Sequence, residues 1–248
     1  MEDDVFCSHF QMKKSTFQKL QIAIKPWWNS SETGRIAITL NKALHITIWK
    51  LCNKCSFRDV SDRFGVAAGL AYKVFLKIIK MICRLKGDVI KFPKTAAEQK
   101  QVNEEFTNLR YNPFRFVIGC IDGTHIPISQ PIKDEISYRN RKGTYSIIAQ
   151  AIVDSRIRFI DAFNGCPGAC HNASVWQRSS VRKAIISKEI KICSNYNLLG
   201  DGRYPLELFL MMPYRDNGFL TPMQSKYNAI LSSTCVVVEQ AFGVSKKN

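Results

Sequence analysis

The chain has 248 residues, of which 46% are hydrophobic and 11% aromatic. This composition excludes an intrinsically disordered protein, because disordered chains contain far fewer apolar residues, and the length allows one large domain or two modest ones. The net charge of +16, from 36 basic and 20 acidic residues, favours nucleic acid as a partner, since binding a polyanion releases its counterions. An ordinary basic surface is the alternative.

No apolar segment of the sequence is long enough to cross a membrane, which takes about 18 residues. The nearest candidate, residues 36–51, is interrupted by Asn41, Lys42, His45 and Lys50. The first residues also lack the basic start and apolar stretch of a signal peptide. We therefore expect a soluble, intracellular protein without a membrane partner. In that setting the nine cysteines are expected to be free thiols rather than disulfides.

Residues 1–93 show a helical pattern that stops at Phe92-Pro93, where proline ends a helix. We predict an all-α domain over 1–93. Its first helix lies around residues 10–24, and its second runs from Ile36 to Cys52.

A helix-turn-helix is predicted over about residues 56–85. Ser56 is a suitable N-cap, Gly65 allows a sharp turn, and Val66 can fill the angle between two helices. The second helix carries a basic stripe made of Lys73, Lys77, Lys80 and Arg84. A one-sided stripe suits a phosphate backbone, and a core helix with a solubilising basic face is the alternative. The start of that helix, residues 67–69, offers no side chain for bidentate base contacts, so sequence-specific recognition is not expected.

After a linker predicted at 94–113, the apolar pattern changes period, and residues 114–248 are expected to form a mixed α/β domain. The predicted strands cover residues 114–121, 145–153, 157–163 and 196–200. Asn164-Gly165 is expected to end the third strand. Asn172 is expected to cap a helix, and a closing helix begins at about Pro222.

Three carboxylates occupy informative places in this domain. Asp122 ends the first predicted strand, Asp201 ends the fourth, and Glu239 lies on the closing helix. Such hard oxygen ligands suit Mg²⁺ or Mn²⁺. Two of these ions about 4 Å apart can activate water and stabilise the leaving oxygen in phosphodiester cleavage. Spacing alone is weak evidence, because any domain of this size has acids near strand ends.

The segments around these acids are more specific than their spacing. They are Ile121–Ile126, Gly200–Leu206, Pro213–Asp216 and Val238–Gly243. Upstream, Ser56–Val60, Arg63–Val66 and Ile90–Pro93 belong to the same set. In this order, over most of the chain, they resemble the PIF/Harbinger transposase superfamily and its vertebrate branch of Harbinger transposase-derived nucleases.

The resemblance implies an RNase H-like, mixed-sheet catalytic domain with a DDE-type metal site, preceded by the all-α helix-turn-helix domain. Asp122, Asp201 and Glu239 match its acidic positions. In such families divalent metals promote attack of water, or of a DNA 3′-hydroxyl, on a phosphodiester. The resemblance also implies a nuclear location, with the cytoplasm as an alternative, and a Myb-like DNA-binding partner protein. We therefore expect a transposase-derived, metal-dependent DNA endonuclease.

Three features depart from the family pattern. Asn172 stands where the family usually has Asp, so this fourth metal position offers a neutral carbonyl in place of a charge. Arg203, where glycine is usual, could compete with a metal at Asp201 or bind DNA phosphate. The family chain normally continues well past Glu239, whereas this sequence ends at Asn248, which indicates a C-terminally truncated nuclease domain. The alternative is therefore a catalytically weakened or inactive, domesticated DNA-binding protein.

Other polar residues leave two interpretations open. His125 suits acid–base chemistry or a strand end equally, whereas a capping role is favoured for His171. A basic loop that could grip DNA contains Arg139, Arg141 and Lys142. A solvated loop is the alternative for these three residues, and a partner-binding scaffold without DNA contact is the weakest interpretation of the whole chain.

Overall fold

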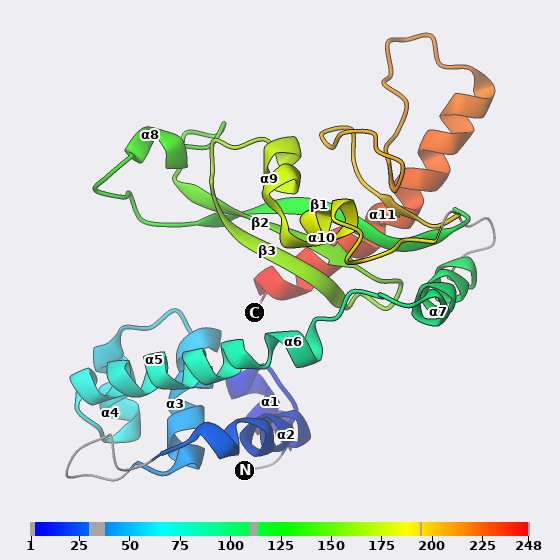
Figure 1. Ribbon diagram of the computed structural model, residues 1–248. Helices are drawn as coiled ribbons and strands as arrows, with labels where there is room; N and C mark the ends of the chain where they lie inside the picture. Colours follow the sequence, from blue (N-terminus) through cyan, green and yellow to red (C-terminus); the bar gives the residue numbers. More distant parts are fainter. Residues whose placement is uncertain (1–2, 30–37, 110–113, 194, 248) are drawn as a thin grey trace. The chain divides into compact units, whose positions relative to one another are not determined.

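The structure is a computed structural model that describes residues 3–29, 38–109, 114–193 and 195–247. The chain divides into two compact units, Met1–Val89 and Ile90–Lys247 (Figure 1). No helix in the described ranges is long and apolar enough to cross a membrane. The nine cysteines are all free.

The first unit is built from helices. They are α1 (Asp3–Phe10), α2 (Lys14–Ile24), the short 3₁₀ turn η1 (Lys25–Trp27), α3 (Leu40–Cys52), α4 (Phe57–Phe64), α5 (Ala68–Arg84) and α6 (Lys86–Val89). Their core consists of side chains such as Phe10 and Phe17 packed against Leu44 of α3 and Ile78 of α5. The single helix expected around residues 10–24 is two helices, because the chain turns at Gln11, whose φ is +51°.

The α4–α5 pair has the turn chemistry expected of its sequence. Ser56 accepts a hydrogen bond from the backbone of Asp59 and Asp59 accepts one in return, which forms a capping box. Gly65 ends α4 with a φ of +58°, a conformation that glycine adopts without steric cost. Val66 packs beside the buried Val60 between the helices. Whether this pair is a DNA-binding helix-turn-helix stays a prediction.

The prediction of a linker over 94–113 is wrong for the residues described. Helix α7 (Ala96–Thr107) lies there, with a capping box between Thr95 and Glu98 at its start. Phe106 is only 1% exposed and packs in the same cluster as strand and helix residues of the second unit. The sequence pattern missed this helix because its single buried aromatic sits in a mostly polar segment. Residues 110–113 lie outside the described part.

The second unit contains a five-stranded mixed sheet in the order β3-β2-β1-β4-β5. Its strands are β1 (Val117–Pro127), β2 (Ser146–Val153), β3 (Phe159–Pro167), β4 (Asn197–Leu199) and β5 (Leu210–Met211). β1, β2 and β3 pair antiparallel, whereas β4 is parallel to β1 and β5 to β4. This arrangement is consistent with an RNase H-like DDE domain, and β5 was not predicted because two residues carry no periodicity.

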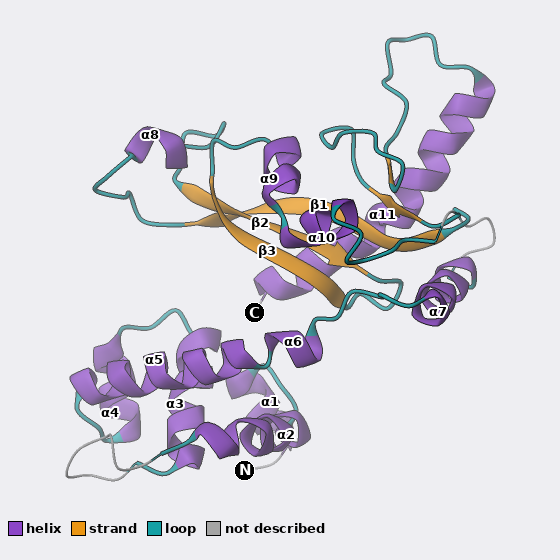
Figure 2. Cartoon of the chain, in the orientation of Figure 1, coloured by secondary structure: helices purple, strands orange, loops and turns teal. Residues whose placement is uncertain are grey.

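Helices cover both faces of the sheet (Figure 2). On one face, α9 (Asn172–Arg178) and α10 (Ser180–Ile186) bury Trp176 and Val181 against Ile121. On the other, α11 (Pro222–Lys247) buries Val238 against Cys120. Because side chains alternate along a strand, neighbouring residues of β1 serve opposite cores. The closing helix predicted from about Pro222 is thereby confirmed. A short helix, α8 (Glu135–Tyr138), precedes β2.

Two predicted strand ends are wrong. β1 does not end before Asp122 but continues to Pro127, because β2 keeps pairing with it as far as Ser146. β3 continues past Asn164-Gly165 to Pro167. The register shifts between Ile148 and Ala149, and Gly165, with a φ of +107°, takes the extra position of a bulge.

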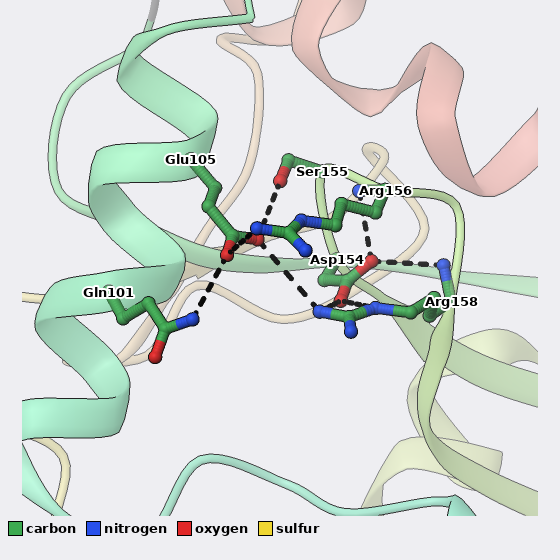
Figure 3. A network of polar contacts seen from close by, with 6 residues as sticks. All are labelled: Gln101, Glu105, Asp154, Ser155, Arg156 and Arg158. Carbon is green, nitrogen blue, oxygen red and sulfur yellow. Dashed lines mark hydrogen bonds and ion pairs between the residues drawn. The ribbon is translucent and has the colours of Figure 1, made fainter.

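A network of polar contacts fastens the β2–β3 turn to α7 (Figure 3). The Asp154 side chain is fully buried, and its Oδ1 accepts hydrogen bonds from the backbone N–H groups of Arg156 and Arg158, both at 2.9 Å. Its Oδ2 accepts one from Arg158 Nε at 2.7 Å. Glu105 of α7 accepts from Arg156 Nη2 at 2.6 Å, so the turn is held to the helix by charge as well as by packing.

We expect Asp154→Ala to destabilise this unit by about 3 kcal/mol, because it removes a buried acceptor of several charge-assisted bonds. Arg158→Ala should cost only about 1 kcal/mol, since the Arg158 side chain is 59% exposed and its pair is screened by solvent. Native-state hydrogen exchange of the β2 and β3 amides measures both losses. Equal losses for the two variants would contradict the role given to the buried carboxylate.

Candidate functional site

Asp122 lies in β1, and Asp201 lies two residues after the end of β4, the strand that runs parallel to β1. Cys120 of β1 is in register with Leu199 of β4. Since residues i and i+2 of a strand point to the same face, Asp122 has the orientation of Cys120, and the charge of Asp201 acts on it from just beyond β4. The face that carries Cys120 is the one covered by α11.

Helix α11 brings Glu239 to the same region. The Cys120 thiol donates to the backbone oxygen of Thr234 at 3.6 Å, which fixes where the helix crosses β1. Val238 is buried in the same cluster, and Glu239, the next residue, is exposed at the edge of that contact. The three predicted acids therefore gather around one part of β1, although they are far apart in the sequence.

The pKa of Asp122 is raised by its burial and by the two other acids near it. Burial, and to a smaller extent the negative charges of Asp201 and Glu239, raise this pKa to about 6. The backbone N–H of Gly123, at 2.6 Å from Oδ1, and the positive charge of Arg203 act in the opposite direction. The negative charges of Asp201 and Glu239 are thus close enough to act on Asp122.

Arg203 forms an ion pair with Asp201. Its Nε is 3.0 Å from Oδ2, and its backbone N–H donates to Oδ1 at 2.9 Å. Both oxygens of Asp201 therefore already have a partner. The Arg203 side chain is 69% exposed, so its guanidinium is held by this contact rather than by surrounding packing.

The carboxylates of Asp122, Asp201 and Glu239 are chemically suited to a divalent cation, but their positions suit it only in part. Carboxylate oxygens are the ligands that Mg²⁺ and Mn²⁺ prefer, and a cation would offset the neighbouring negative charges that act on Asp122. Within the described ranges, however, no three His, Cys, Asp or Glu side chains are arranged to hold a metal ion. The contact of Arg203 with Asp201 and the exposed position of Glu239 are consistent with this.

Asn172 lies beside Gly123 rather than capping a helix. The N-cap position of α9 belongs to His171, and Asn172 is the first helical residue, so the predicted capping role of Asn172 is wrong. Gly123 leaves room for it, since a Cβ there would come within 3.0 Å of Asn172 Oδ1. Gly123 has the strand parity of Ile121, which faces α9, so Asn172 approaches β1 from the face opposite to α11.

A cleft borders this region, and we call it the basic cleft. Its volume is about 810 Å³, and among the described residues lining it are four lysines and arginines and no aspartate or glutamate. The residues that carry charge or polar groups into it are Thr124, His125, Asn140, Arg141, Lys142, Thr144, Ser146, His171, Asn172, Arg203 and Lys246. Lys246 was not predicted, although it lies seven residues after Glu239 and hence on the same face of α11.

Short hydrogen bonds order the interior of the basic cleft. Arg141 Nη2 donates to His171 Nδ1 at 2.9 Å, and His125 Nδ1 is bonded to Ser146 Oγ at 2.9 Å. Burial lowers the pKa of His125, and the positive charges of Lys246, Arg203 and Lys142 lower it further. The cations of the cleft thus surround His125. Two residues of the predicted basic loop, Arg141 and Lys142, line the cleft. The third, Arg139, lies outside it, where its backbone pairs with that of Tyr145 in an isolated β-bridge.

The predicted basic stripe on α5 divides into two pairs. Lys77 Nζ lies 4.8 Å from the centre of the Trp28 ring and the Arg84 guanidinium 5.8 Å from that of Trp27, so both make cation–π contacts within the first unit. Lys73 and Lys80 are exposed on the same helix. The latter pair is therefore better placed to contact a phosphate backbone.

Comparisons with known proteins show which proteins this chain resembles. A family model described as "DDE superfamily endonuclease" matches residues 121–248. The human protein "Putative nuclease HARBI1" is 27% identical over 183 residues, which cover 74% of this chain and 50% of the human one, and the cattle protein of that name gives the same figures. "Protein ALP1-like" of Arabidopsis thaliana is 22% identical, covering 97% of this chain and 62% of its own.

The chain spans about half the length of the animal relatives it matches. No solved structure matches it significantly.

The raised pKa of Asp122 predicts a pH-dependent stability. The folded protein binds a proton at Asp122 more tightly than the unfolded chain, so this stabilising contribution is full below about pH 4 and lost as the pH rises through about 6. In metal-free buffer at pH 8, Asp122→Asn should therefore be more stable than the unchanged protein by about 2 kcal/mol. Urea unfolding between pH 4 and pH 8 measures the difference, which should shrink towards pH 4.

The matched control is Asp88→Asn, which removes an exposed carboxylate of the first unit. Its stability should follow the pH dependence of the unchanged protein. If Asp122→Asn did the same, the cost of burying a charge at Asp122 beside two other carboxylates would be absent.

Proposed function

The chain belongs to the DDE superfamily endonucleases, whose family model matches just over half of it, and from this membership we propose that it is a divalent-metal-dependent DNA endonuclease that hydrolyses phosphodiester bonds. The expected relationship to Harbinger transposase-derived nucleases is confirmed by its similarity to the human and Arabidopsis proteins. The activity itself is our proposal for the region that these relatives share with it.

The observation that carries the proposal is the meeting of three elements: β1, which contains Asp122, pairs in parallel with β4, which Asp201 follows, and α11, which carries Glu239, packs against β1. We assign the three acids to the catalytic metal site, and Asn172 to a fourth, neutral position at its margin. A divalent cation held by these groups would supply the Lewis acidity that phosphodiester cleavage needs. Asp122 would be ionised, and so able to hold a cation, above about pH 6.

DNA would be held by cations outside the acid cluster. We propose that the exposed basic loop binds the phosphate backbone near the acids, and that the basic stripe on α5, through Lys73 and Lys80, binds it elsewhere along the DNA. The loop residues are Arg139, Arg141 and Lys142, and the stripe residues are Lys73, Lys77, Lys80 and Arg84. The net charge of +16 supports a polyanionic partner for the whole chain.

A second candidate function is DNA binding without cleavage. It is favoured by the contact between Arg203 and Asp201, because an arginine that engages both oxygens of a metal ligand lowers the affinity for metal. Asn172 acts in the same direction, since a neutral amide cannot replace the charge of a carboxylate. A nuclear location and a Myb-like partner protein remain part of the proposal only through the family resemblance.

We expect the purified protein to nick supercoiled DNA in the presence of Mg²⁺ or Mn²⁺ and not in EDTA. Asp122→Asn and Glu239→Gln should each lower the rate by at least about a hundredfold, because each removes a charge from the metal site. The controls are Asp88→Asn and Glu189→Gln, which remove exposed carboxylates away from the site. Nicking that survives equally in Asp122→Asn would exclude the proposed activity, and DNA binding without any nicking would establish the second candidate.

The two pairs in the basic stripe should differ in DNA binding. Lys73→Gln with Lys80→Gln is expected to reduce the slope of log affinity against log salt concentration by roughly 2, since two phosphate contacts are lost. Lys77→Gln with Arg84→Gln removes the same charge but should mainly lower the melting temperature, because it breaks the contacts with Trp28 and Trp27. Fluorescence anisotropy over a salt series and thermal unfolding separate these effects. Identical salt slopes for the two double variants would argue against phosphate contacts by this helix.

A further inference from the structure

The basic cleft carries more positive charge than its own surroundings neutralise. Within the described part of the chain, Lys142 and Lys246 form no ion pair, and Arg141 is bonded to Nδ1 of His171 rather than to a carboxylate. Only Arg203, the fourth cation, has an acidic partner. A concave surface with unpaired cations and no acidic side chain attracts an anion.

A buried polar side chain lies in the wall of the same cleft. Asn172 lines the cleft, is only 8% exposed, and its Nδ2 has no hydrogen-bond partner. Buried amide groups almost always have a partner, because leaving one unpaired is costly. An anion with several oxygens, bound between this amide and the lysines, would provide the missing acceptor.

The size and lining of the cleft narrow the class of ligand. A volume of about 810 Å³ suits one nucleotide and is far too small for a duplex. The described residues that line it include no Phe, Tyr or Trp, so a base would find no large ring on which to stack. Recognition would therefore depend on the phosphate, with weaker polar contacts to the sugar from groups such as Thr124 and Thr144.

The cleft also begins directly beside the acids. Gly123, which lines it, follows Asp122 in β1, and Arg203 lines it while bonded to Asp201. A strand whose scissile phosphate lies at the acids would place a neighbouring nucleotide in the cleft.

We propose that the basic cleft binds one nucleotide of a single DNA strand through its phosphate, held by Lys142, Lys246 and the amide of Asn172, next to the bond that is cleaved. The position relative to cleavage rests on the proposed endonuclease function, whereas phosphate binding does not. The neutral side chain of Asn172 then has a positive role. An aspartate in its place would set a negative charge against the phosphate.

The test is isothermal titration calorimetry in EDTA, so that no metal contributes, with the 5′-phosphorylated thymidine dinucleotide pTpT as the probe. The cleft variant is Lys142→Gln with Lys246→Gln. Its matched control is Lys183→Gln with Lys226→Gln, which removes the same charge from exposed positions outside the cleft. We expect the cleft variant to bind pTpT about tenfold more weakly or worse, and the control to stay within about twofold of the unchanged protein.

Asn172→Asp should also weaken pTpT binding by about tenfold, whereas a merely structural role for Asn172 would leave it unchanged. Thymidine, which has no phosphate, should not bind measurably, and inorganic phosphate should bind at least about tenfold more weakly than pTpT. Equal losses in the two double variants would overturn the proposal. The proposal would also be overturned if thymidine bound as tightly as pTpT. It would be overturned as well if inorganic phosphate did, because the cleft would then be a site for free phosphate.

Asp122→Asn separates this inference from the proposed function. It should abolish nicking and leave pTpT binding in EDTA unchanged within about twofold. If the unchanged protein binds pTpT but never nicks DNA, the phosphate site in the cleft is supported and the endonuclease function is refuted. If the protein nicks DNA but all variants bind pTpT with the same affinity, the endonuclease function is supported and the phosphate site is refuted.

Discussion

The parallel pairing of β1 with β4 is the constraint on which the rest of this site depends. β4 has only three residues, yet its register with β1 sets Asp201 beside Asp122. Beyond the irregularity between Val117 and Gly119 the register must hold, because a shift by one residue would turn Asp122 towards the opposite core. The buried Leu199 and Cys120, which pack against α11, maintain that register, so the hydrophobic core of this face and the geometry of the acids are the same feature.

Around that pair the molecule separates negative from positive charge. The three carboxylates gather around the part of β1 that α11 covers, whereas the basic cleft is lined by residues from the β1 end, the loop before β2 and the start of α9. Arg203 belongs to both, since it is bonded to Asp201 and lines the cleft. A cation would therefore compete with Arg203 for the carboxylate oxygens of Asp201, and a substrate phosphate in the cleft would compete with Asp201 for Arg203. This makes Arg203 the residue through which binding at the cleft and charge at the acids are connected.

Much of the architecture followed from local sequence pattern. Alternation and apolar runs predicted β2 and the core of β1, and a long helical pattern predicted α11. The failures occur where tertiary contacts override local signals. Helix α7 was missed although Thr95 and Glu98 form a capping box at its start, because its packing depends on the burial of Phe106 and on the Glu105 network, neither of which has a local pattern. β1 passes Asp122 because β2 supplies partners beyond it, and Asn172 is packed against Gly123 instead of capping α9.

The sequence by itself determined the family, since segments such as Ile121–Ile126 and Val238–Gly243 carry that relationship in their residue types, and it identified the acids that belong to the site. Only the tertiary structure decided their environment: that Arg203 engages Asp201, that burial and two neighbouring charges raise the pKa of Asp122, and that Lys246 joins Lys142 across a cleft. The physical reason is that burial and Coulomb interactions depend on distances between residues remote in the chain. Strand register and helix packing set those distances, and no local pattern records them.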